Sequence, residues 1–306
     1  MSLIVAEEYI NIHERGVVLT KEWLSALLNK DTVTVRSGVW YEKNFPIAKE
    51  GIFEPSTHDE LFLIEGKSWW FKQRNAFIEA GINRFPPSEN TIVDLGGGNG
   101  FVASHLESCG FEVALFEPGA QGIENAKRRG LKNLVCAPVN STTVKPNSIS
   151  AIGLFDVLEH ISDESSFLNE LQEVLKNDGI LYITVPAHNF LWSSADEDAG
   201  HFRRYNKNSI KNVLADNGFD VVFVSYFFRF LSLPIFLFRT LPSKFLRKKQ
   251  PQSVTKTSNF IVPKFVERIV SLIYDIEIRK FSRSKIRHGA SIFIVATPAR
   301  HTKYGL

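Results

Sequence analysis

Apolar and polar residues are arranged along the chain in blocks that predict strands and helices in alternation. From residue 92 to residue 185, short apolar runs alternate with amphipathic stretches, and the links between them are short. Such alternation predicts a parallel sheet covered by helices on both faces, with ligands at the carboxyl ends of the strands. The predicted elements are strand 92–95, helix 100–109, strand 111–116, helix 119–129, strand 132–136, strand 149–155, helix 163–176 and strand 180–185.

The segment before this block predicts an N-terminal appendage that covers residues 1–60. Residues 17–28 have the pattern of a short amphipathic helix, and residues 31–41 alternate as a strand with a turn at Ser37-Gly38. We expect this appendage to pack against the main domain or to cover it.

The segment after the predicted strand 219–225 is expected to form a helical insertion over residues 226–288. Its first part is very apolar, but Arg229, Pro234 and Arg239 interrupt it and make it a poor transmembrane span. The remaining predicted elements are helix 263–281 and strand 291–297, and the main domain then comprises residues 61–225 and 289–306.

The composition is that of an ordered globular protein. The chain has 306 residues, of which 44% are hydrophobic and 23% are charged, and its net charge of +3 is too small to indicate a nucleic-acid partner by itself. Two cysteines, Cys109 and Cys136, suit a reducing compartment and exclude a disulfide framework. Residues 1–15 have no long apolar run, so we expect no signal peptide and a cytoplasmic location.

The most specific stretch is the glycine-rich turn after the first predicted strand of the block. Asp94 lies inside that strand, and Gly96, Gly98 and Gly100 follow at alternate positions, where they allow the backbone to approach a ligand at the start of a helix. The next strand ends at Glu117, a position suited to contact a ribose. This pattern predicts a nucleotide-like ligand, and a dinucleotide such as NAD remains an alternative at this point.

Two motifs resemble class I S-adenosylmethionine-dependent methyltransferases. The first is the D-x-G-x-G-x-G turn with Glu117, and the second is the D-V-L-E-H segment 156–160 after the fourth strand, which argues against NAD. Further segments, W-W-F-x-x-R-N at 69–75, V-P-A-H at 185–188 and G-H-x-R-R-Y at 200–205, resemble a bacterial small-molecule subgroup of type 11 or 12. The resemblance implies a Rossmann-like sheet of seven strands, mostly parallel, with an antiparallel last strand.

The resemblance also implies S-adenosylmethionine as cofactor. The family commonly has an acid after the third strand that reads adenine, but residues 135–140 contain none, so backbone groups near Ala137 or the side chain of Asn140 would have to replace it. The residues that the resemblance assigns to the cofactor are Trp70, Arg74, Asp94, Gly96, Gly97, Gly98, Glu117, Pro118, Ala137, Phe155 and Asp156. The alternative to a cofactor contact is that Arg74 is a solvated helix residue beside aromatic side chains of the core.

Two histidines are the candidate catalytic residues. His160 or His201 would act as a general base if the acceptor is a hydroxyl. Some relatives with an E-x-x-E-H segment bind a divalent ion there, so Glu159, His160 and His201 are alternative ligands, although we expect no metal.

The long loop after the strand 180–185 is the candidate acceptor site. Its basic and aromatic residues suit an acceptor with an anionic or sugar-like group. Because adjacent arginines diverge, we expect one to face the pocket and the other to pair with Asp196 or Asp198. The candidate residues are His188, Trp192, Arg203, Arg204 and Tyr205.

The sequence therefore predicts methyl transfer from S-adenosylmethionine to a small-molecule, sugar-linked or lipid-linked acceptor, with O-methylation favoured. One alternative is a binding protein that has lost catalysis, and another is a nucleic-acid methyltransferase that uses the basic C-terminal quarter. No N-P-P-Y element is present, so we expect no nucleic-acid partner. Residues 226–281 have the composition of a membrane-surface contact, and a lid or a dimer face is an equal alternative.

Overall fold

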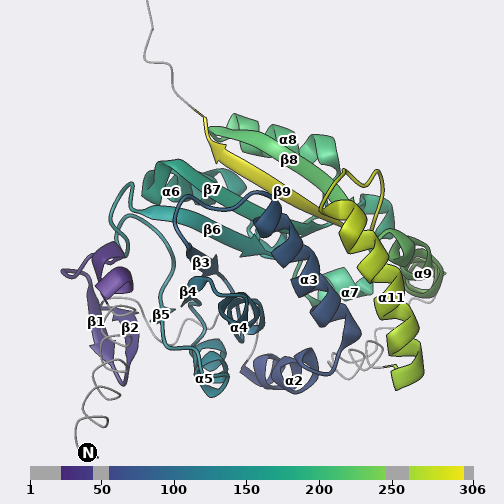
Figure 1. Ribbon diagram of the computed structural model, residues 1–306, viewed down its shortest axis with the longest axis horizontal. Coiled ribbons are helices and arrows are strands. Elements are labelled where there is room, and N and C mark those ends of the chain that lie inside the picture. The colour runs from purple at the N-terminus through teal and green to yellow at the C-terminus, as the bar shows by residue number, and fades with distance from the viewer. Residues whose placement is uncertain (1–21, 44–54, 246–261, 300–306) are drawn as a thin grey trace, which may run out of the picture.

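A mixed sheet of nine strands forms the centre of the protein (Figure 1). The structure is a computed structural model that describes residues 22–43, 55–245 and 262–299. The strands are β1 (Val33–Arg36), β2 (Val39–Glu42), β3 (Thr91–Leu95), β4 (Glu112–Phe116), β5 (Leu134–Cys136), β6 (Ile149–Phe155), β7 (Leu175–Pro186), β8 (Phe219–Phe227) and β9 (Ser291–Pro298). Their spatial order is β1-β2-β5-β4-β3-β6-β7-β9-β8.

The pairing confirms a mostly parallel sheet with an antiparallel last strand, but the predicted number of seven strands is wrong. β3, β4, β5, β6 and β7 pair in parallel, whereas β9 runs antiparallel to both β7 and β8. The two additional strands form a hairpin, and β2 pairs in parallel with β5 from Val39 to Tyr41. This hairpin covers a sheet edge that would otherwise expose unpaired backbone groups.

Helices cover the sheet and place loops at the carboxyl ends of its parallel strands. α3 and α11 lie side by side in front of the sheet, and α8 packs against β8 (Figure 1). The main helices are α2 (Pro55–Glu65), α3 (Trp69–Arg84), α4 (Phe101–Ser108), α5 (Ala120–Arg128), α6 (Glu164–Val174), α7 (Ser194–Asp198), α8 (Lys207–Asp216) and α11 (Lys264–Phe281). Within the predicted helix 17–28, residues 22–27 are helical and residues 17–21 lie outside the described part of the chain.

The described residues between β8 and β9 are mainly helical. Short elements come first, and α11 returns the chain toward β9. The short elements are η3 (Arg229–Leu231), α9 (Ser232–Ile235), the π-helix η4 (Phe236–Thr240) and α10 (Leu241–Phe245). Residues 246–261 of the predicted insertion lie outside the described part.

An aromatic cluster fixes α3 and α11 to the sheet. Phe281 of α11 is fully buried, and its ring centroid lies 5.5 Å from that of Phe77 and 5.6 Å from that of Phe293, in both cases edge to face. Gly81 of α3 lies over Phe293, whose ring leaves no room for a Cβ atom there. Edge-to-face pairs of this kind add stability beyond the apolar area that they bury.

In the described ranges, none of the helices has both the length and the apolar character that a membrane-crossing helix requires.

Candidate functional site

The glycine turn between β3 and α4 has the left-handed backbone that its sequence predicts. Gly96, Gly98 and Gly100 have φ angles of 68°, 56° and 73°. A Cβ atom on Gly97 would lie 2.5 Å from Oδ2 of Asp94, so the turn lies directly on that carboxyl group. A Cβ atom on Gly98 would meet nothing within 4 Å, and the turn is therefore open on that side.

Glu117 follows β4 and faces the same turn. Its carboxylate is buried and accepts hydrogen bonds from the backbone N–H of Gly98 (3.0 Å) and of Gly119 (2.7 Å). Burial raises the pKa of Glu117, although these two hydrogen bonds act in the opposite direction. The structure thus brings the turn and the second-strand acid into direct contact.

Asp94 is fully buried beneath the turn. Burial raises its pKa to about 7, and the positive charge of Arg74 and the backbone N–H of Ala103 partly offset the effect. A carboxyl group with such a pKa has both protonation states available near neutral pH.

Asp156 lies at the end of β6 and pairs with Arg74 of α3. Arg74 Nε lies 2.7 Å from Asp156 Oδ2, and Arg74 Nη2 donates to the backbone carbonyl of Phe155 at 2.9 Å. Thr184 of β7 donates to Asp156 Oδ1 at 3.1 Å. Asp156 has φ of 59°, a conformation that is uncommon for residues other than glycine and that clusters at functional sites. The ring of Trp70 lies 5.6 Å from the Arg74 guanidinium carbon.

β5, the third strand of the predicted alternating block, ends without an acid, and the residues that follow it make weak contacts. The thiol of Cys136 donates to the carbonyl of Pro118 at 3.6 Å, and Ala137 is fully buried next to it. The side-chain oxygen of Asn140 accepts from the backbone N–H of Thr142 and of Thr143, both at 3.0 Å. Asn140 therefore stabilises its own turn, which leaves backbone groups near Ala137 as the candidates for adenine.

The two predicted catalytic histidines lie together. The rings of His160 and His201 meet edge to face with centroids 4.7 Å apart. Burial and the neighbouring His201 lower the pKa of His160 to about 4. His201 Nδ1 lies 2.9 Å from Oδ1 of Asp196, which orients the imidazole and directs Nε2 away from Asp196.

Asp196 connects His201 to Arg204. Arg204 donates from Nε and Nη2 to the two carboxylate oxygens of Asp196, at 2.7 and 3.0 Å. Burial alone would raise the pKa of Asp196, but hydrogen bonds from His201 and Arg204 outweigh it and lower the pKa to about 2. Arg204 is thus the arginine that pairs with an acid of its own loop, as expected for one of the two.

Arg203, the arginine expected to face the pocket, is paired as well. It forms an ion pair with Glu164 of α6 and donates to the carbonyl of Ser162 at 3.0 Å. The buried hydroxyl of Tyr205 donates to the same Glu164. Sequence reasoning did not anticipate this pairing, because Glu164 lies close to the loop in space although it is distant in sequence.

His188 and Trp192 occupy the first half of the loop. His188 has φ of 64° and stacks on Tyr226 of β8 with ring centroids 4.9 Å apart. Trp192 Nε1 donates to Glu197 at 3.4 Å. Thr240 of η4 donates to the carbonyl of Leu191 at 3.0 Å and so fixes this half of the loop to the helical segment after β8.

The Glu159, His160 and His201 side chains could also hold a metal ion. Their ligand atoms all lie within 4.8 Å of one another, and Glu159 is buried. Burial, followed by the charge of Asp156, raises the pKa of Glu159 well above its usual value. A histidine oriented by an outer carboxylate, as His201 is by Asp196, is common around bound metals. The residues therefore permit either a general base or a metal site.

Sequence reasoning missed a polar network through which α2 covers the glycine turn. Asn99 of the turn donates to the carbonyl of His58 at 2.9 Å, and Arg129 donates to the carbonyl of Asn99 at 2.9 Å and pairs with Glu65. The positive charge of His58 lowers the pKa of Glu117, so α2 lies near the candidate ribose acid. Polar residues on a helix usually indicate a solvated face, and nothing in the sequence distinguished these buried ones.

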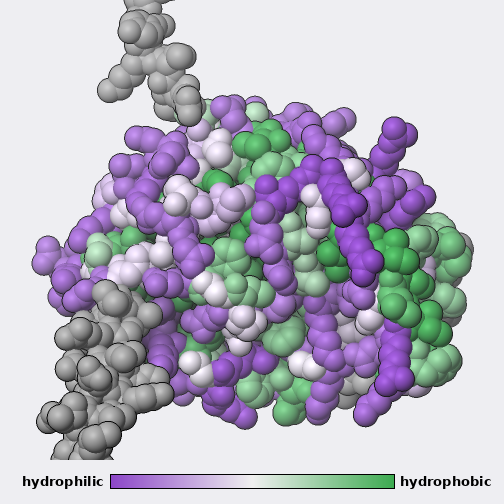
Figure 2. All heavy atoms as spheres, in the orientation of Figure 1, coloured by the Kyte–Doolittle hydropathy of each residue, from purple (hydrophilic) through white to green (hydrophobic). Residues whose placement is uncertain are grey.

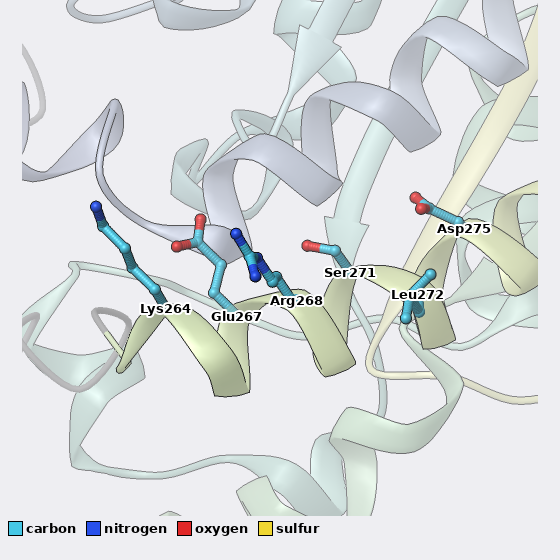
Figure 3. A pocket seen from close by; sticks show the side chains of 6 residues that line it. All are labelled: Lys264, Glu267, Arg268, Ser271, Leu272 and Asp275. Carbon is cyan, nitrogen blue, oxygen red and sulfur yellow. The ribbon is translucent and has the colours of Figure 1, made fainter.

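A surface hollow runs along α11 and contains none of the predicted site residues (Figure 3). Its described lining consists of Lys264, Glu267, Arg268, Ser271, Leu272 and Asp275. These side chains do not belong to the site at the sheet edge.

Residues 70–224 match the family model of the methyltransferase domain, which is just over half of the chain. The chain belongs to this family. The family model confirms the expected methyltransferase domain, and two of the matched relatives are named as probable S-adenosylmethionine-dependent methyltransferases, in line with the expected cofactor. The bacterial subgroup stays a prediction.

The curated relatives are distant. The chain is 25% identical over 113 residues to a ubiquinone biosynthesis O-methyltransferase of Caulobacter vibrioides, a match of 35% of this chain and 45% of that protein. It is 22% identical over 160 residues to a probable S-adenosylmethionine-dependent methyltransferase of Mycobacterium tuberculosis, a match of 50% and 56%. The chain thus spans about half the length of the curated relatives that it matches.

Solved structures show a more extended but weaker likeness. A chain of the complex between the Haloferax volcanii Trm112 methyltransferase activator and a methyltransferase has a TM-score of 0.49 and 14% identity, with 81% of this chain and 100% of that chain covered. An S-adenosylmethionine-dependent methyltransferase of Archaeoglobus fulgidus has a TM-score of 0.45 and 16% identity, with 73% and 94% covered. Likeness at this level says nothing about acceptor or activity.

Proposed function

We propose that this protein transfers a methyl group from S-adenosylmethionine to a hydroxyl group of a small-molecule, sugar-linked or lipid-linked acceptor. The observation that carries the proposal is the hydrogen bond between His201 Nδ1 and Asp196 (2.9 Å). An imidazole that donates Nδ1–H to a carboxylate has Nε2 available to accept a proton. A hydroxyl must lose its proton when it is methylated, and an imidazole oriented in this way can accept that proton. A histidine in purely apolar surroundings would have no carboxylate to orient it for this role.

The residues around the glycine turn suit the cofactor. The open side of Gly98 leaves room beside the turn, and Glu117, whose two oxygens keep lone pairs beyond those used by Gly98 and Gly119, would hold the ribose hydroxyls. Trp70, Arg74 and Asp156 would contact the amino-acid part of the cofactor. Pro118, Ala137 and Phe155 would contact its adenine base and form the walls of the pocket. Bound S-adenosylmethionine supplies an electrophilic methyl group, and the protein's contribution is to align the acceptor and exclude water.

The proposed general base is His201. Asp196 holds its tautomer and stabilises the positive charge that it gains with the acceptor's proton. His160, whose pKa is about 4, stays neutral at physiological pH and would orient the acceptor hydroxyl.

The acceptor side is proposed to be the loop around His188 and Trp192. Arg203 and Arg204 are each paired with a carboxylate, so we assign them to holding this loop, together with Tyr205. The relative named for ubiquinone biosynthesis is compatible with O-methylation of a small molecule. A cytoplasmic location and the lack of a nucleic-acid partner remain predictions from the sequence.

The second candidate is metal-assisted O-methylation. It is favoured by one observation, the convergence of Glu159, His160 and His201 within 4.8 Å. In that case a bound divalent ion would lower the pKa of the acceptor hydroxyl and His201 would be a ligand.

The test is incubation of the protein with methyl-labelled S-adenosylmethionine and a bacterial extract that contains metabolites, lipids and nucleic acid. We expect label in a methyl ether of a small or lipid-linked molecule. Label in RNA or DNA would support the nucleic-acid alternative, and cofactor binding without any labelled product would support the inactive binding protein.

A further inference from the structure

α11 has two apolar faces, and one of them is exposed. Tyr274 and Phe281 are buried against the sheet and α3. On the opposite side of the helix, four large apolar residues at helical spacing are 50–68% exposed: Phe265, Ile269, Leu272 and Ile276. An ordinary surface helix would carry polar residues there, so this exposed face requires another explanation.

The short elements after β8 extend the apolar surface. Four of their side chains are 43–77% exposed: Phe230, Leu233, Leu237 and Phe238. The backbone N–H of Arg229, where this segment begins, donates to Glu277 of α11 at 2.9 Å and so joins the two elements. Figure 2 shows hydrophobic side chains gathered at the right-hand edge, over the region of α9 and α11 in Figure 1.

The same part of the chain is strongly basic. Residues 229–290 contain 14 Lys and Arg against three Asp and Glu, whereas the whole chain has a net charge of only +3, so the rest of the chain is net negative. The exposed cations Lys264, Arg268, Arg279 and Lys280 flank the apolar stripe of α11. Figure 3 labels Lys264 and Arg268 on α11, together with the acids Glu267 and Asp275.

We propose that the face formed by α11 and residues 229–240 docks on the surface of an anionic phospholipid bilayer. Apolar side chains flanked by Lys and Arg are the combination that a bilayer interface selects, because the apolar groups enter the acyl boundary and the cations meet the anionic headgroups. A nucleic acid would use the cations and leave the apolar stripe in water. A second copy of this chain would bring two basic faces together, which like-charge repulsion opposes.

Docking of this face has a consequence for the candidate site. The hydroxyl of Thr240 donates a hydrogen bond to the backbone carbonyl of Leu191 at 3.0 Å, so the docking face is attached to the loop that carries His188 and Trp192. The docking would therefore hold that loop near the membrane. The proposal does not depend on methyl transfer, since a catalytically inactive protein with this face would dock equally.

The test is flotation of the full chain with two kinds of vesicle, phosphatidylcholine alone and phosphatidylcholine mixed with phosphatidylglycerol. We expect binding to the anionic vesicles at low salt, weaker binding at high salt, and little binding to the neutral vesicles. The double variant Leu272→Glu/Ile276→Glu should reduce binding about ten-fold or more, because it removes two apolar anchors and adds two negative charges. The variant Leu272→Gln/Ile276→Gln should lose less, since its charge is unchanged.

Val35→Glu is the matched control. Val35 is 49% exposed on β1, at the edge of the sheet opposite to β8, so its replacement should leave binding unchanged. Because all three positions are exposed, thermal unfolding midpoints and S-adenosylmethionine affinity should match those of the wild type. The proposal is wrong if the protein does not float with anionic vesicles, if neutral vesicles bind it equally, or if the double variants bind like the wild type. Self-association that depends on Leu272 and Ile276, without flotation, would also overturn it in favour of a second copy.

Discussion

Replacement of Glu117 by Gln tests the proposed ribose contact with the smallest change of shape. The carboxylate has two backbone donors, Gly98 N–H at 3.0 Å and Gly119 N–H at 2.7 Å, and its remaining lone pairs are available for two hydroxyls. The amide of Gln has one oxygen, so it loses an acceptor toward the ribose and also the negative charge. A charge-assisted hydrogen bond contributes about 1.5–3 kcal/mol, which corresponds to an affinity for S-adenosylmethionine about 10- to 150-fold weaker.

The stability of this variant should fall by less than the full cost of one lost buried hydrogen bond. The amide nitrogen must face one of the two backbone N–H groups, which costs about 1–3 kcal/mol for the donor that loses its acceptor. Burial raises the pKa of Glu117, so the ionised carboxylate is itself unfavourable in the fold, and its removal offsets part of that loss. Calorimetric titration measures the affinity, and thermal unfolding measures the stability. Glu112→Gln, an exposed acid at the start of the same strand, is the matched control. Wild-type affinity in the folded Glu117→Gln variant would refute the ribose assignment.

Three further predictions concern stability and metals. Because burial raises the pKa of Asp94 from 3.8 to about 7, the folded state binds a proton more tightly than the unfolded state. The wild type should therefore lose stability relative to Asp94→Asn as the pH rises from about 4 to 7, by up to about 4 kcal/mol. Urea unfolding of both proteins at several pH values measures this difference. A stability difference that does not change with pH would contradict the prediction. Phe281→Ala should cost about 3–5 kcal/mol in unfolding free energy, whereas Phe265→Ala on the exposed face of the same helix should change it by less than about 0.5 kcal/mol. A chelator should leave turnover unchanged if His201 is a base, and loss of turnover that added zinc or magnesium restores would instead identify Glu159, His160 and His201 as metal ligands.

The alternating strands and the glycine turn could be predicted because their signals are local. The turn needs glycine at three left-handed positions, and β6 is buried along its whole length, so an apolar run marks it. Residues 31–41 could be predicted as a strand with a Ser37-Gly38 turn, but not as the β1–β2 hairpin that joins the central sheet. Which edge a hairpin pairs with depends on the neighbours that the fold supplies, here β5.

The candidate site was predictable as a set of motifs but not as a set of contacts. One of the two adjacent arginines was expected to pair with Asp196 or Asp198, and the structure pairs Arg204 with Asp196, a residue of the same loop. Arg203 pairs with Glu164, a residue of another helix, and only the folding of α6 against the loop brings the two charges together. The network of His58, Asn99 and Arg129 was missed for the same reason, because these polar residues are paired through backbone carbonyls of distant segments.

The most direct test of the central claim is a comparison of His201→Ala with the wild type in two assays, once an acceptor has been identified: methyl transfer with labelled S-adenosylmethionine, and calorimetric binding of the cofactor. The general base lies on the acceptor side, so turnover should fall by about 100-fold or more while cofactor affinity changes less than about two-fold. Asp196→Asn should lower turnover in the same direction, because Asp196 orients the imidazole and stabilises the charge that it gains with the acceptor's proton. Full turnover in His201→Ala, with the cofactor still bound, would contradict the account.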